Sequence, residues 1–216
     1  MHILNFEAFL VAIALLTITP GIDTVLVIKN TSRSGGKDGV VTSLGICLGL
    51  FVHGTFSAVG ISAILLQSAE LFLAIKWVGA AYLIWLGIGG VKAAIKGHAG
   101  IAIDNTMVRS LSVRRSLKEG FLSNVLNPKT AVFYLAFLPQ FIDPHYSPFL
   151  QAMTMASIHF VIAMIWQSGL AGAVSSAKHF FANPLALRWM EGITGSVLIF
   201  LGSKLILDEQ NVNRSQ

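Results

Sequence analysis

The chain has 216 residues, of which 54% are hydrophobic and 12% charged, and its formal net charge at pH 7 is +5. Soluble domains carry about 25% charged residues, so this composition excludes an ordinary water-soluble globule. The single cysteine, Cys47, excludes a scaffold held by internal disulfides. The composition therefore predicts an all-α, polytopic membrane protein, because each spanning helix needs about 20 mostly apolar residues.

Six apolar segments predict transmembrane helices, in chain order near residues 6–28, 39–66, 71–91, 119–141, 149–174 and 189–207. Each is much longer than the roughly 10 residues of an alternating barrel strand. The first segment lacks a basic start and a small-residue cleavage site, so we expect it to remain as a helix rather than to be cleaved as a signal peptide. A five-span protein with one re-entrant segment is the alternative.

Lysine and arginine gather in the connections after the first, third and fifth predicted helices. The residues concerned are Lys29, Arg33, Lys37, Lys92, Lys96, Arg109, Arg114, Arg115, Lys118, Lys178 and Arg188. Cationic loops stay on the cytoplasmic side of a membrane, so both termini are predicted to lie outside. The basic excess is therefore an orientation signal and indicates no nucleic-acid partner.

Residues 97–118 are the most polar stretch and predict a cytoplasmic loop. This loop divides a single transmembrane domain, residues 1–216, into halves of about 1–96 and 119–208. Because each half has three predicted spans, the two halves would insert with opposite topology. The sequence thus predicts two inverted three-helix repeats.

Several features recur at matching places in the two halves. The first helix of each half contains a proline, Pro20 or Pro128, and the second contains a histidine, His53 or His159. The third helices carry similar runs, which are Lys76-Trp77 with Leu83-Ile84-Trp85-Leu86-Gly87 and Arg188-Trp189 with Leu198-Ile199-Phe200-Leu201-Gly202. Inverted repeats with interrupted helices in matching positions are typical of secondary transporters.

The first candidate binding segment is Thr19-Pro20-Gly21-Ile22-Asp23. Proline removes one backbone donor and glycine adds freedom, so the helix is expected to kink or unwind here. The restarting half-helix presents N–H groups and a positive dipole end to the gap. A carboxylate at mid-membrane is costly and indicates function. The alternative for Asp23 is a structural N-cap paired with a base.

The second candidate segment is Asn127-Pro128-Lys129 in the fourth predicted span. The Asn127 side chain suits the N-cap of a restarting helix, and Pro128 suits its first position. Pro20 and Pro128 lie about equally far from the cytoplasmic side, so Asp23 and Lys129 are predicted neighbours. Either a gating ion pair that substrate replaces or mutual neutralisation of two buried charges would follow, and both interpretations remain open.

The proton-coupling candidates are Asp23, His53 and His159. Gly45, Gly49 and His53 recur every four residues and so line one helical face, which would let another helix, or a second copy in a homo-oligomer, approach closely. His159 shares a similar face in the fifth predicted span. An imidazole there could relay protons, although a histidine that only hydrogen-bonds between helices is the commoner case.

Several chemical motifs are absent from the sequence. There is no Walker A loop, no Gly-x-Ser-x-Gly elbow and no His/Cys/carboxylate spacing suited to a metal, so no cofactor and no metal are predicted. Neither an enzyme nor direct use of ATP is therefore expected. The alternatives to a transporter are an intramembrane hydrolase that uses a membrane histidine and a membrane scaffold that transports nothing.

Three motifs together carry a resemblance to a known family. They are Thr19-Pro20-Gly21-Ile22-Asp23, then Lys76-Trp77-Val78-Gly79-Ala80-Ala81-Tyr82-Leu83-Ile84-Trp85-Leu86-Gly87, and Gly120-Phe121-Leu122-Ser123-Asn124-Val125-Leu126-Asn127-Pro128-Lys129 with the following Phe137-Leu138-Pro139-Gln140-Phe141. Over nearly the whole chain these motifs resemble the LysE/RhtB family of bacterial amino-acid exporters. The family often has proline at the position of Ile22, a difference that bears on the geometry of the first break.

The resemblance implies a secondary transporter of the bacterial inner membrane that exports an amino acid from the cytoplasm, driven by the proton-motive force. Asp23 would pair with the ammonium of a zwitterion and Lys129 with its carboxylate. Exporters of basic amino acids in this family carry an acid where this chain has Phe133. The threonine/homoserine-type branch is closer, which implies a small neutral substrate.

Overall fold

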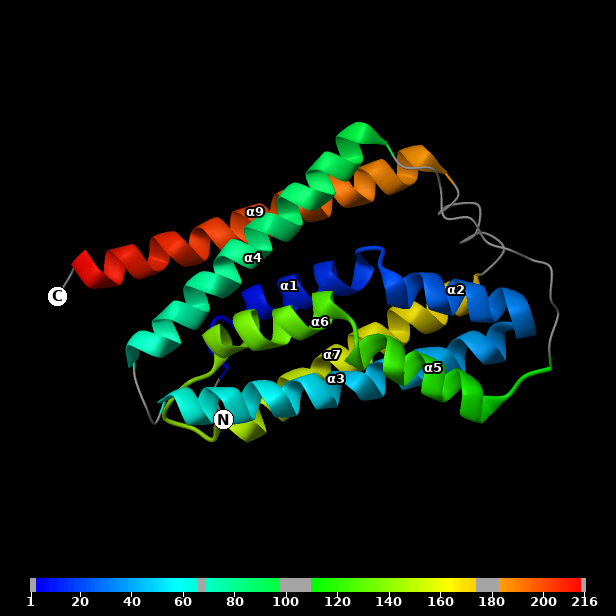
Figure 1. The fold of residues 1–216 in the computed structure, drawn as a ribbon, viewed down its shortest axis with the longest axis horizontal. Helices are drawn as coiled ribbons and strands as arrows, with labels where there is room; N and C mark the ends of the chain where they lie inside the picture. Colours follow the sequence, from blue (N-terminus) through cyan, green and yellow to red (C-terminus); the bar gives the residue numbers. More distant parts are fainter. Residues whose placement is uncertain (1–2, 66–68, 98–109, 174–182, 215–216) are drawn as a thin grey trace.

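A computed structural model describes residues 3–65, 69–97, 110–173 and 183–214, which are almost entirely helical (Figure 1). The elements are α1 (Phe6–Ile18), α2 (Ile22–Ser34), α3 (Gly36–Leu65), α4 (Ala69–Lys96), α5 (Val113–Val125), α6 (Pro128–Val132), the π-helical η1 (Phe133–Phe137), the 3₁₀-helical η2 (Leu138–Phe141), α7 (Pro148–Gly172) and α9 (Pro184–Arg214). For this part of the chain the all-α prediction is confirmed.

Four stretches of these helices are long and apolar enough to cross a membrane: Gly36–Gly60, Trp77–Lys96, Pro148–Gly172 and Pro184–Ser203. Helices α1 and α2 meet at a bend of 49° and together make a fifth candidate, a broken span. The prediction of a multi-pass helical membrane protein is therefore confirmed.

The predicted fourth span, 119–141, has a different character. It falls on α5, α6, η1 and η2, and α5 begins at Val113, so the last part of the predicted loop 97–118 is already helical. Residues 98–109 of that loop lie outside the described residues. Arg114, Arg115 and Lys118 make the first half of α5 strongly cationic, and no single apolar spanning helix forms over this segment among the described residues. Six spans thus stay a prediction.

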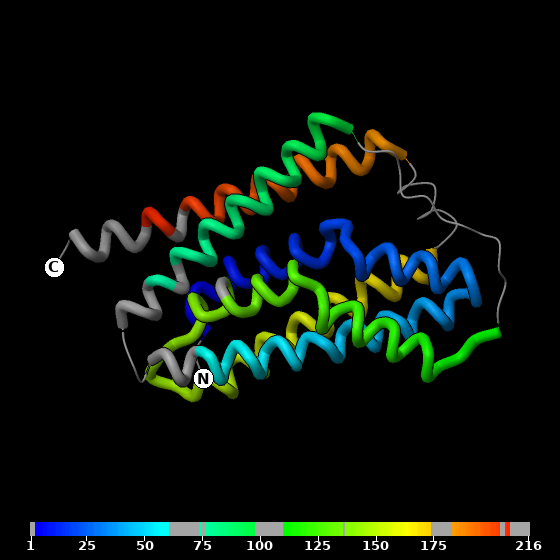
Figure 2. Tube along the Cα trace, viewed as in Figure 1, coloured from blue at the N-terminus to red at the C-terminus, as the bar shows by residue number. Residues whose placement is uncertain are grey.

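Helices α4 and α9 form an antiparallel pair that crosses the other helices at an angle (Figures 1 and 2). Glycines let their backbones approach closely. A Cβ atom on Gly87 would lie 2.5 Å from the carbonyl oxygen of Gly195, and one on Gly202 would lie 2.8 Å from that of Ala80. The pair presents large apolar side chains outward, including Trp85 and Trp189, each 66% exposed. This surface is suited to a lipid environment.

Within the rest of the bundle, the backbones of α3 and α5 approach each other closely. A Cβ atom on Gly45 would overlap the backbone of Leu117, and one on Gly120 would overlap the carbonyl oxygen of Thr42. The prediction that the Gly45/Gly49 face admits a close helix is confirmed, but the partner is α5 of the same chain. A homo-oligomer would therefore have to use another surface.

Substituting Gly45 by alanine is expected to lower the free energy of unfolding by about 1–3 kcal/mol, because the added methyl group overpacks a backbone contact. The matched control is Gly169→Ala in α7, where nothing lies within 4 Å of the new Cβ atom. There alanine should instead raise helix stability by up to about 1 kcal/mol. Thermal unfolding of both variants in detergent measures the difference, and equal midpoints would contradict the tight α3–α5 contact.

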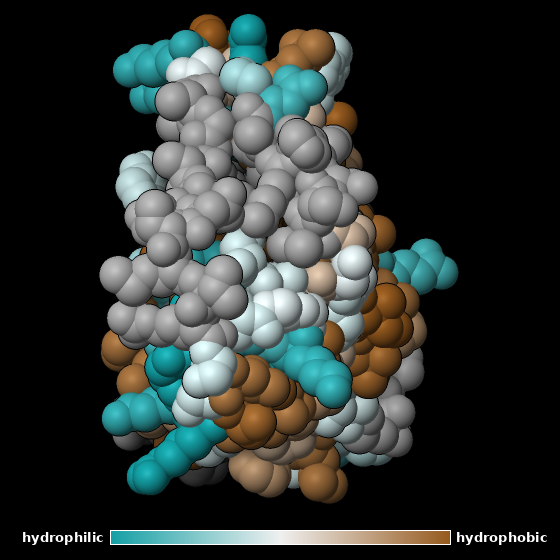
Figure 3. All heavy atoms as spheres, turned by 90° about the vertical axis from the view of Figure 1, so that its right-hand side faces the viewer, coloured by the Kyte–Doolittle hydropathy of each residue, from teal (hydrophilic) through white to brown (hydrophobic). Residues whose placement is uncertain are grey.

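The buried side chains include a large apolar cluster and a separate group of polar residues. The largest cluster of buried apolar side chains includes Phe9, Phe133, Phe137 and Phe141. Toward the junction of α2 and α3, fully buried polar side chains appear, among them Asn30, Asp38, Thr42 and Ser116. The outer face of that same end carries hydrophilic side chains beside apolar ones (Figure 3), and Lys37, Arg114 and Lys118 are exposed.

Candidate functional site

The break between α1 and α2 leaves backbone carbonyls that a lysine satisfies. In a continuous helix the amide of residue 20 would donate to the carbonyl of Leu16, but proline has no N–H. Lys129 Nζ donates to Leu16 O at 2.9 Å and to Thr19 O at 3.1 Å. The predicted break at Thr19-Pro20-Gly21 is thus confirmed, and a cation from the second half of the chain stabilises it.

The second break lies between α5 and α6. Helix α5 ends at Val125, and Asn127 caps α6 by accepting a hydrogen bond from the Lys129 amide at 3.0 Å, with Pro128 in the first turn. The predicted cap is confirmed. The chain then continues as a π-helix and a 3₁₀-helix, so the backbone stays irregular through Phe141. Irregular backbone at membrane depth is tolerated where protein or water satisfies its polar groups.

Asp23 joins the two breaks. Its carboxylate accepts hydrogen bonds from Ser123 Oγ at 2.6 Å, Asn124 Nδ2 at 3.0 Å and Asn127 Nδ2 at 3.1 Å. All three donors come from the end of α5 or the cap of α6. The alternative of a structural N-cap is wrong, because Gly21 is the N-cap of α2 and has no side chain to bond. Asp23 instead fixes the first turn of α2 against the second break.

A cavity of about 40 Å³ lies where the breaks meet. Because one water needs about 10–15 Å³ of such a cavity, the cavity has room for a few waters in this conformation. Its walls come from α1, α2, α3, α5, α6 and α7. The lining residues are Leu16, Thr17, Thr19, Gly21, Asp23, Thr24, Ile46, Leu50, Asn124, Asn127, Lys129, Thr130, His159, Ala163 and Gln167.

Most of the predicted site residues meet at this cavity. Those that line it are Thr19, Gly21, Asp23, Asn127, Lys129 and His159. Pro20 and Pro128 belong to the breaks but do not line the cavity, and neither does His53. The two chain segments around Pro20 and Pro128 therefore lie at one cavity, as predicted.

Asp23 and Lys129 share the cavity without pairing with each other. The carboxylate bonds to the donors on α5 and Asn127, and the ammonium bonds to the two carbonyls of the first break. Within the part of the chain that the structure describes, no ion pair joins them. Neither the gating pair nor the mutually neutralising pair is formed in this conformation. Each charge is instead stabilised separately by its own protein partners.

His159 is held from both sides of its ring. Thr17 Oγ1 donates to Ile13 O at 2.7 Å, so it accepts from His159 Nε2 at 3.0 Å. In the neutral ring Nδ1 then accepts from the Tyr134 hydroxyl, also at 3.0 Å. The network therefore assigns the Nε2–H tautomer to a histidine at the cavity wall.

His53 is also buried, and it bonds to Asn124 O at 3.0 Å. Because a carbonyl only accepts, His53 Nε2 carries a proton as well. His53 thereby supports the segment that holds Asp23, from outside the cavity.

Ser123 and Asn124 are not among the predicted site residues, although both lie in a motif that carries the resemblance and both bond to Asp23. They precede Asn127 by four and three residues, a spacing that places side chains on one helical face and could have identified them. Thr17 and Tyr134 carried no such signal. Their bonds to His159 depend on the packing of α1 and η1 against α7.

Comparison with known proteins identifies the family of the chain. A family profile described as "LysE type translocator" matches residues 14–209 of the chain. An uncharacterized membrane protein of Bacillus subtilis, YrhP, is 34% identical over 212 residues, which cover 94% of this chain and 98% of the relative. The homoserine/homoserine lactone efflux protein of Salmonella typhimurium is 30% identical over 199 residues, or 92% of this chain and 94% of the relative.

No solved structure matches the chain. The family assignment therefore depends on the profile and on these relatives, which cover nearly the whole chain and include both helix breaks. The chain belongs to the LysE type translocator family, and it is a membrane transporter rather than an enzyme.

Proposed function

We propose that this protein exports a small neutral amino acid, similar to threonine or homoserine, from the cytoplasm. The observation that carries the proposal is the cavity at the two helix breaks, whose wall holds both Asp23 and Lys129. The name of the Salmonella relative, an efflux protein for homoserine and its lactone, supports the same substrate class.

The chemistry of the cavity suits a zwitterion. Asp23 would attract the substrate ammonium, and Lys129 would attract its carboxylate, since one of the three ammonium donors remains after the bonds to Leu16 and Thr19. The N-terminus of α2, at Gly21, adds a positive dipole end on the same wall. The two side-chain charges cancel, so a substrate without net charge leaves the cavity neutral. Thr17, Thr24, Thr130 and Gln167 supply polar groups for a hydroxyl side chain.

A cationic substrate would need a further acid near the second break. The residue six positions after Asn127 is Phe133, which is 1% exposed and packs among other aromatic rings. Because that position provides no carboxylate, lysine and arginine are not expected as substrates.

We further propose six spans in two inverted halves, about 1–96 and 119–208, that alternate access to the cavity. The order of elements supports this. A broken helix pair and two long helices make up each half, as α1 to α4 and as α5 to α9. The α4–α9 contact is also consistent with a two-fold axis, because Gly87 meets Gly195 while Ala80 meets Gly202. Gly87 and Gly202 are 115 residues apart in the sequence, and so are Ala80 and Gly195. The two contacts therefore join equivalent positions of the two halves with their roles exchanged, as a two-fold axis requires.

The proposed orientation puts the junction of α2 and α3, the start of α5 and the end of α7 in the cytoplasm of a bacterium, with both termini outside the inner membrane. These ends lie at the same side of the bundle (Figure 1). Lys29, Lys37, Arg114 and Lys118 are exposed there, which supports the assignment because cationic ends stay cytoplasmic.

Export is proposed to be driven by protons. Asp23 is the first candidate for the coupling group, because protonation would weaken its three hydrogen bonds to Ser123, Asn124 and Asn127 and so release α2. His159 and His53 are the other candidates. His159 contacts the cavity directly and is bonded on both ring nitrogens, whereas His53 acts one residue further away through Asn124.

Counterflow in proteoliposomes tests the proposal. Vesicles preloaded with one unlabelled amino acid receive a trace of the same labelled compound, for threonine, homoserine, leucine, lysine and arginine in turn. Saturable accumulation of threonine or homoserine, but not of lysine or arginine, is the expected result. An imposed proton gradient should then drive net movement. Exchange of lysine would reject the neutral-substrate assignment, and no exchange by folded protein would favour a membrane scaffold.

A further inference from the structure

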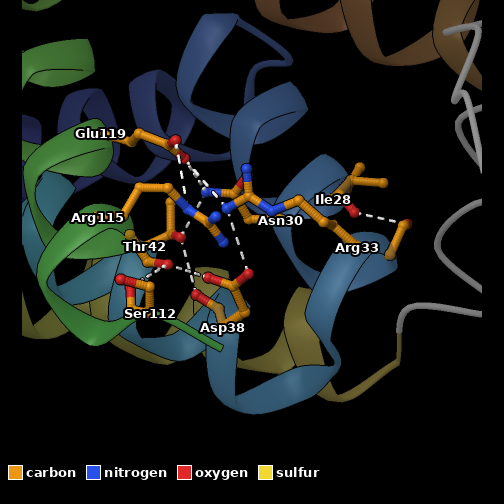
Figure 4. Close-up of polar contacts among 10 residues, drawn as sticks. Ile28, Asn30, Arg33, Asp38, Thr42, Ser112, Arg115 and Glu119 are labelled. Atoms are coloured by element: carbon orange, nitrogen blue, oxygen red, sulfur yellow. Dashed lines mark hydrogen bonds and ion pairs between the residues drawn. The ribbon is translucent and has the colours of Figure 1, made fainter. Parts of the chain in front are cut away.

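A second polar cluster joins α2 to α3 and α5 (Figure 4), and none of its members lines the cavity. We name it the latch, and its members are Asn30, Arg33, Asp38, Thr42 and Glu119. Asn30, Asp38 and Thr42 are 0% exposed, whereas the side chains of Arg33 and Glu119 are 16% and 34% exposed, so the latch extends from the interior to the surface near the end of the bundle.

Two α2 side chains make the contacts across the latch. Arg33 Nη2 lies 3.3 Å from Asp38 Oδ2 on α3 and 3.2 Å from Glu119 Oε2 on α5. Asn30 Nδ2 donates to Thr42 Oγ1 on α3 and to Glu119 Oε2, both at 2.9 Å. Each of the two α2 residues thus bonds to both neighbouring helices. Hydrogen bonds with charged partners are the stronger class, so the latch fixes the end of α2 firmly.

The latch lies between the cavity and the end of the bundle. On α2, Thr24 lines the cavity, Val27 lies about one turn further along the helix, and Arg33 lies near the end of the helix. Val27 packs with Ile46 and Ala171 in a separate buried apolar cluster. From Thr24 to Arg33 the helix rises by about 13 Å, at about 1.5 Å per residue. The path from the cavity to this end therefore meets an apolar layer and then the latch.

Helix α2 has a possible pivot at its start and is joined to α3 at its other end through Gly35 alone. It begins after the break at Thr19–Gly21, so it can turn on that point without distorting α1. Helices α3 and α5 interlock through Gly45 and Gly120, where backbone meets backbone, whereas α2 meets α3 at Gly39 through the side chain of Thr31. Asp38 also accepts a hydrogen bond from Ser116 of α5, so it stays with that pair when α2 moves.

We propose that α2 is the inner gate of the transporter and that Asn30 and Arg33 latch it shut against Asp38, Thr42 and Glu119. This inference rests on the proposed export function, since the gate is assigned to the cytoplasmic side from which substrate enters. In the described conformation the gate is closed. Opening separates Arg33 and Asn30 from their partners and tilts α2 away from the apolar layer, which exposes the cavity to the cytoplasm.

The test measures access to the cavity and uses no substrate. Cys47 is replaced by alanine, and the reporter is the thiol introduced by Ala163→Cys at the cavity wall. Inside-out membrane vesicles are treated with a membrane-impermeant maleimide, and the labelling rate is compared with and without Arg33→Gln. We expect labelling to be about tenfold faster with Arg33→Gln, a shift in the opening equilibrium of about 1.4 kcal/mol.

The matched control is Arg115→Gln, which makes the same chemical change in a neighbouring residue (Figure 4). The Arg115 ion pair with Glu119, at 3.8 Å, lies within α5 and ties no helices together, so the labelling rate should stay at the reference value. Glu119→Gln is the second latch variant and should also speed labelling. It carries the test if Arg33→Gln fails to give a monodisperse protein.

Two outcomes would overturn the latch: folded Arg33→Gln or Glu119→Gln protein that labels at the reference rate, and Arg115→Gln protein that labels as fast as the latch variants. The export proposal fails separately. Faster labelling of the latch variants in a protein that shows no amino-acid counterflow would keep the gate and reject the exporter. Counterflow by the unmodified protein, with no change in labelling, would keep the exporter and reject the gate.

Discussion

Replacing Asp23 by asparagine is expected to reduce amino-acid counterflow by about 30-fold or more while the protein still folds. The substitution removes the only carboxylate on the described cavity wall, and losing one partner of a buried charge pair costs about 2–5 kcal/mol, with about 1.4 kcal/mol for each tenfold change. The asparagine has the same shape. Its oxygen can still accept from two of the three donors on Ser123, Asn124 and Asn127.

Two controls separate the role of the charge in transport from its role in the fold. Glu7→Gln makes an acid-to-amide change at an exposed position of α1 and should leave counterflow unchanged. Ser123→Ala keeps the Asp23 charge but removes one hydrogen bond, which should cost about 1 kcal/mol of stability and only part of the transport rate. Full counterflow by Asp23→Asn, or a loss of transport that matches its loss of folded protein, would leave Asp23 with a structural role alone.

The two breaks could be predicted from sequence because their causes are local. Pro20 removes a donor wherever it stands in a helix, and Asn127 followed by Pro128 forms a cap from three consecutive residues. The equal distance of Pro20 and Pro128 from the cytoplasmic side also predicts that Asp23 and Lys129 are neighbours, and both line one cavity. This distance does not predict their partners, because Ser123 and Asn124 reach Asp23 only through the packing of α2 against α5.

The positions of lysine and arginine predict the orientation of the chain, but they do not predict the contacts of the latch. The sequence places Arg33 in a cationic loop, whereas in the structure Arg33 lies within α2 and forms ion pairs with Asp38 and Glu119. A residue's sequence position at a helix end does not reveal that acids 5 and 86 residues away turn toward it. The sequence likewise predicts a loop at the start of α5, because the cationic first turns of this helix show no membrane-spanning pattern.

The sequence also does not predict which helix packs against the Gly45/Gly49 face. Small residues four apart signal a close helix contact but not which helix makes it. Here Gly120 of α5 completes the contact from the other side, opposite Thr42. That pairing matters for function, because a rigid α3–α5 unit is what the proposed gate closes against.

Replacing Lys129 by methionine is expected to reduce both stability and homoserine counterflow. Methionine fills a similar volume but cannot donate, so Leu16 O and Thr19 O lose their common partner at the first break. Each unsatisfied carbonyl costs about 1–3 kcal/mol where cavity water does not replace the donor. The thermal midpoint in detergent should therefore fall more than it does for Asp23→Asn. Lys118→Met, at an exposed position of α5, is the matched control and should change neither property.

The choice of substrate separates the two roles of Lys129. Homoserine has a carboxylate, whereas its lactone has an uncharged ring ester and keeps only the ammonium. If Lys129 binds the carboxylate, Lys129→Met should lose homoserine counterflow by at least about tenfold more than it loses lactone counterflow, because only homoserine loses a charged contact. Asp23→Asn should weaken both compounds alike, since both carry the ammonium. Equal losses of homoserine and lactone in Lys129→Met would instead mean that the lysine serves the helix break and that another group recognises the carboxylate.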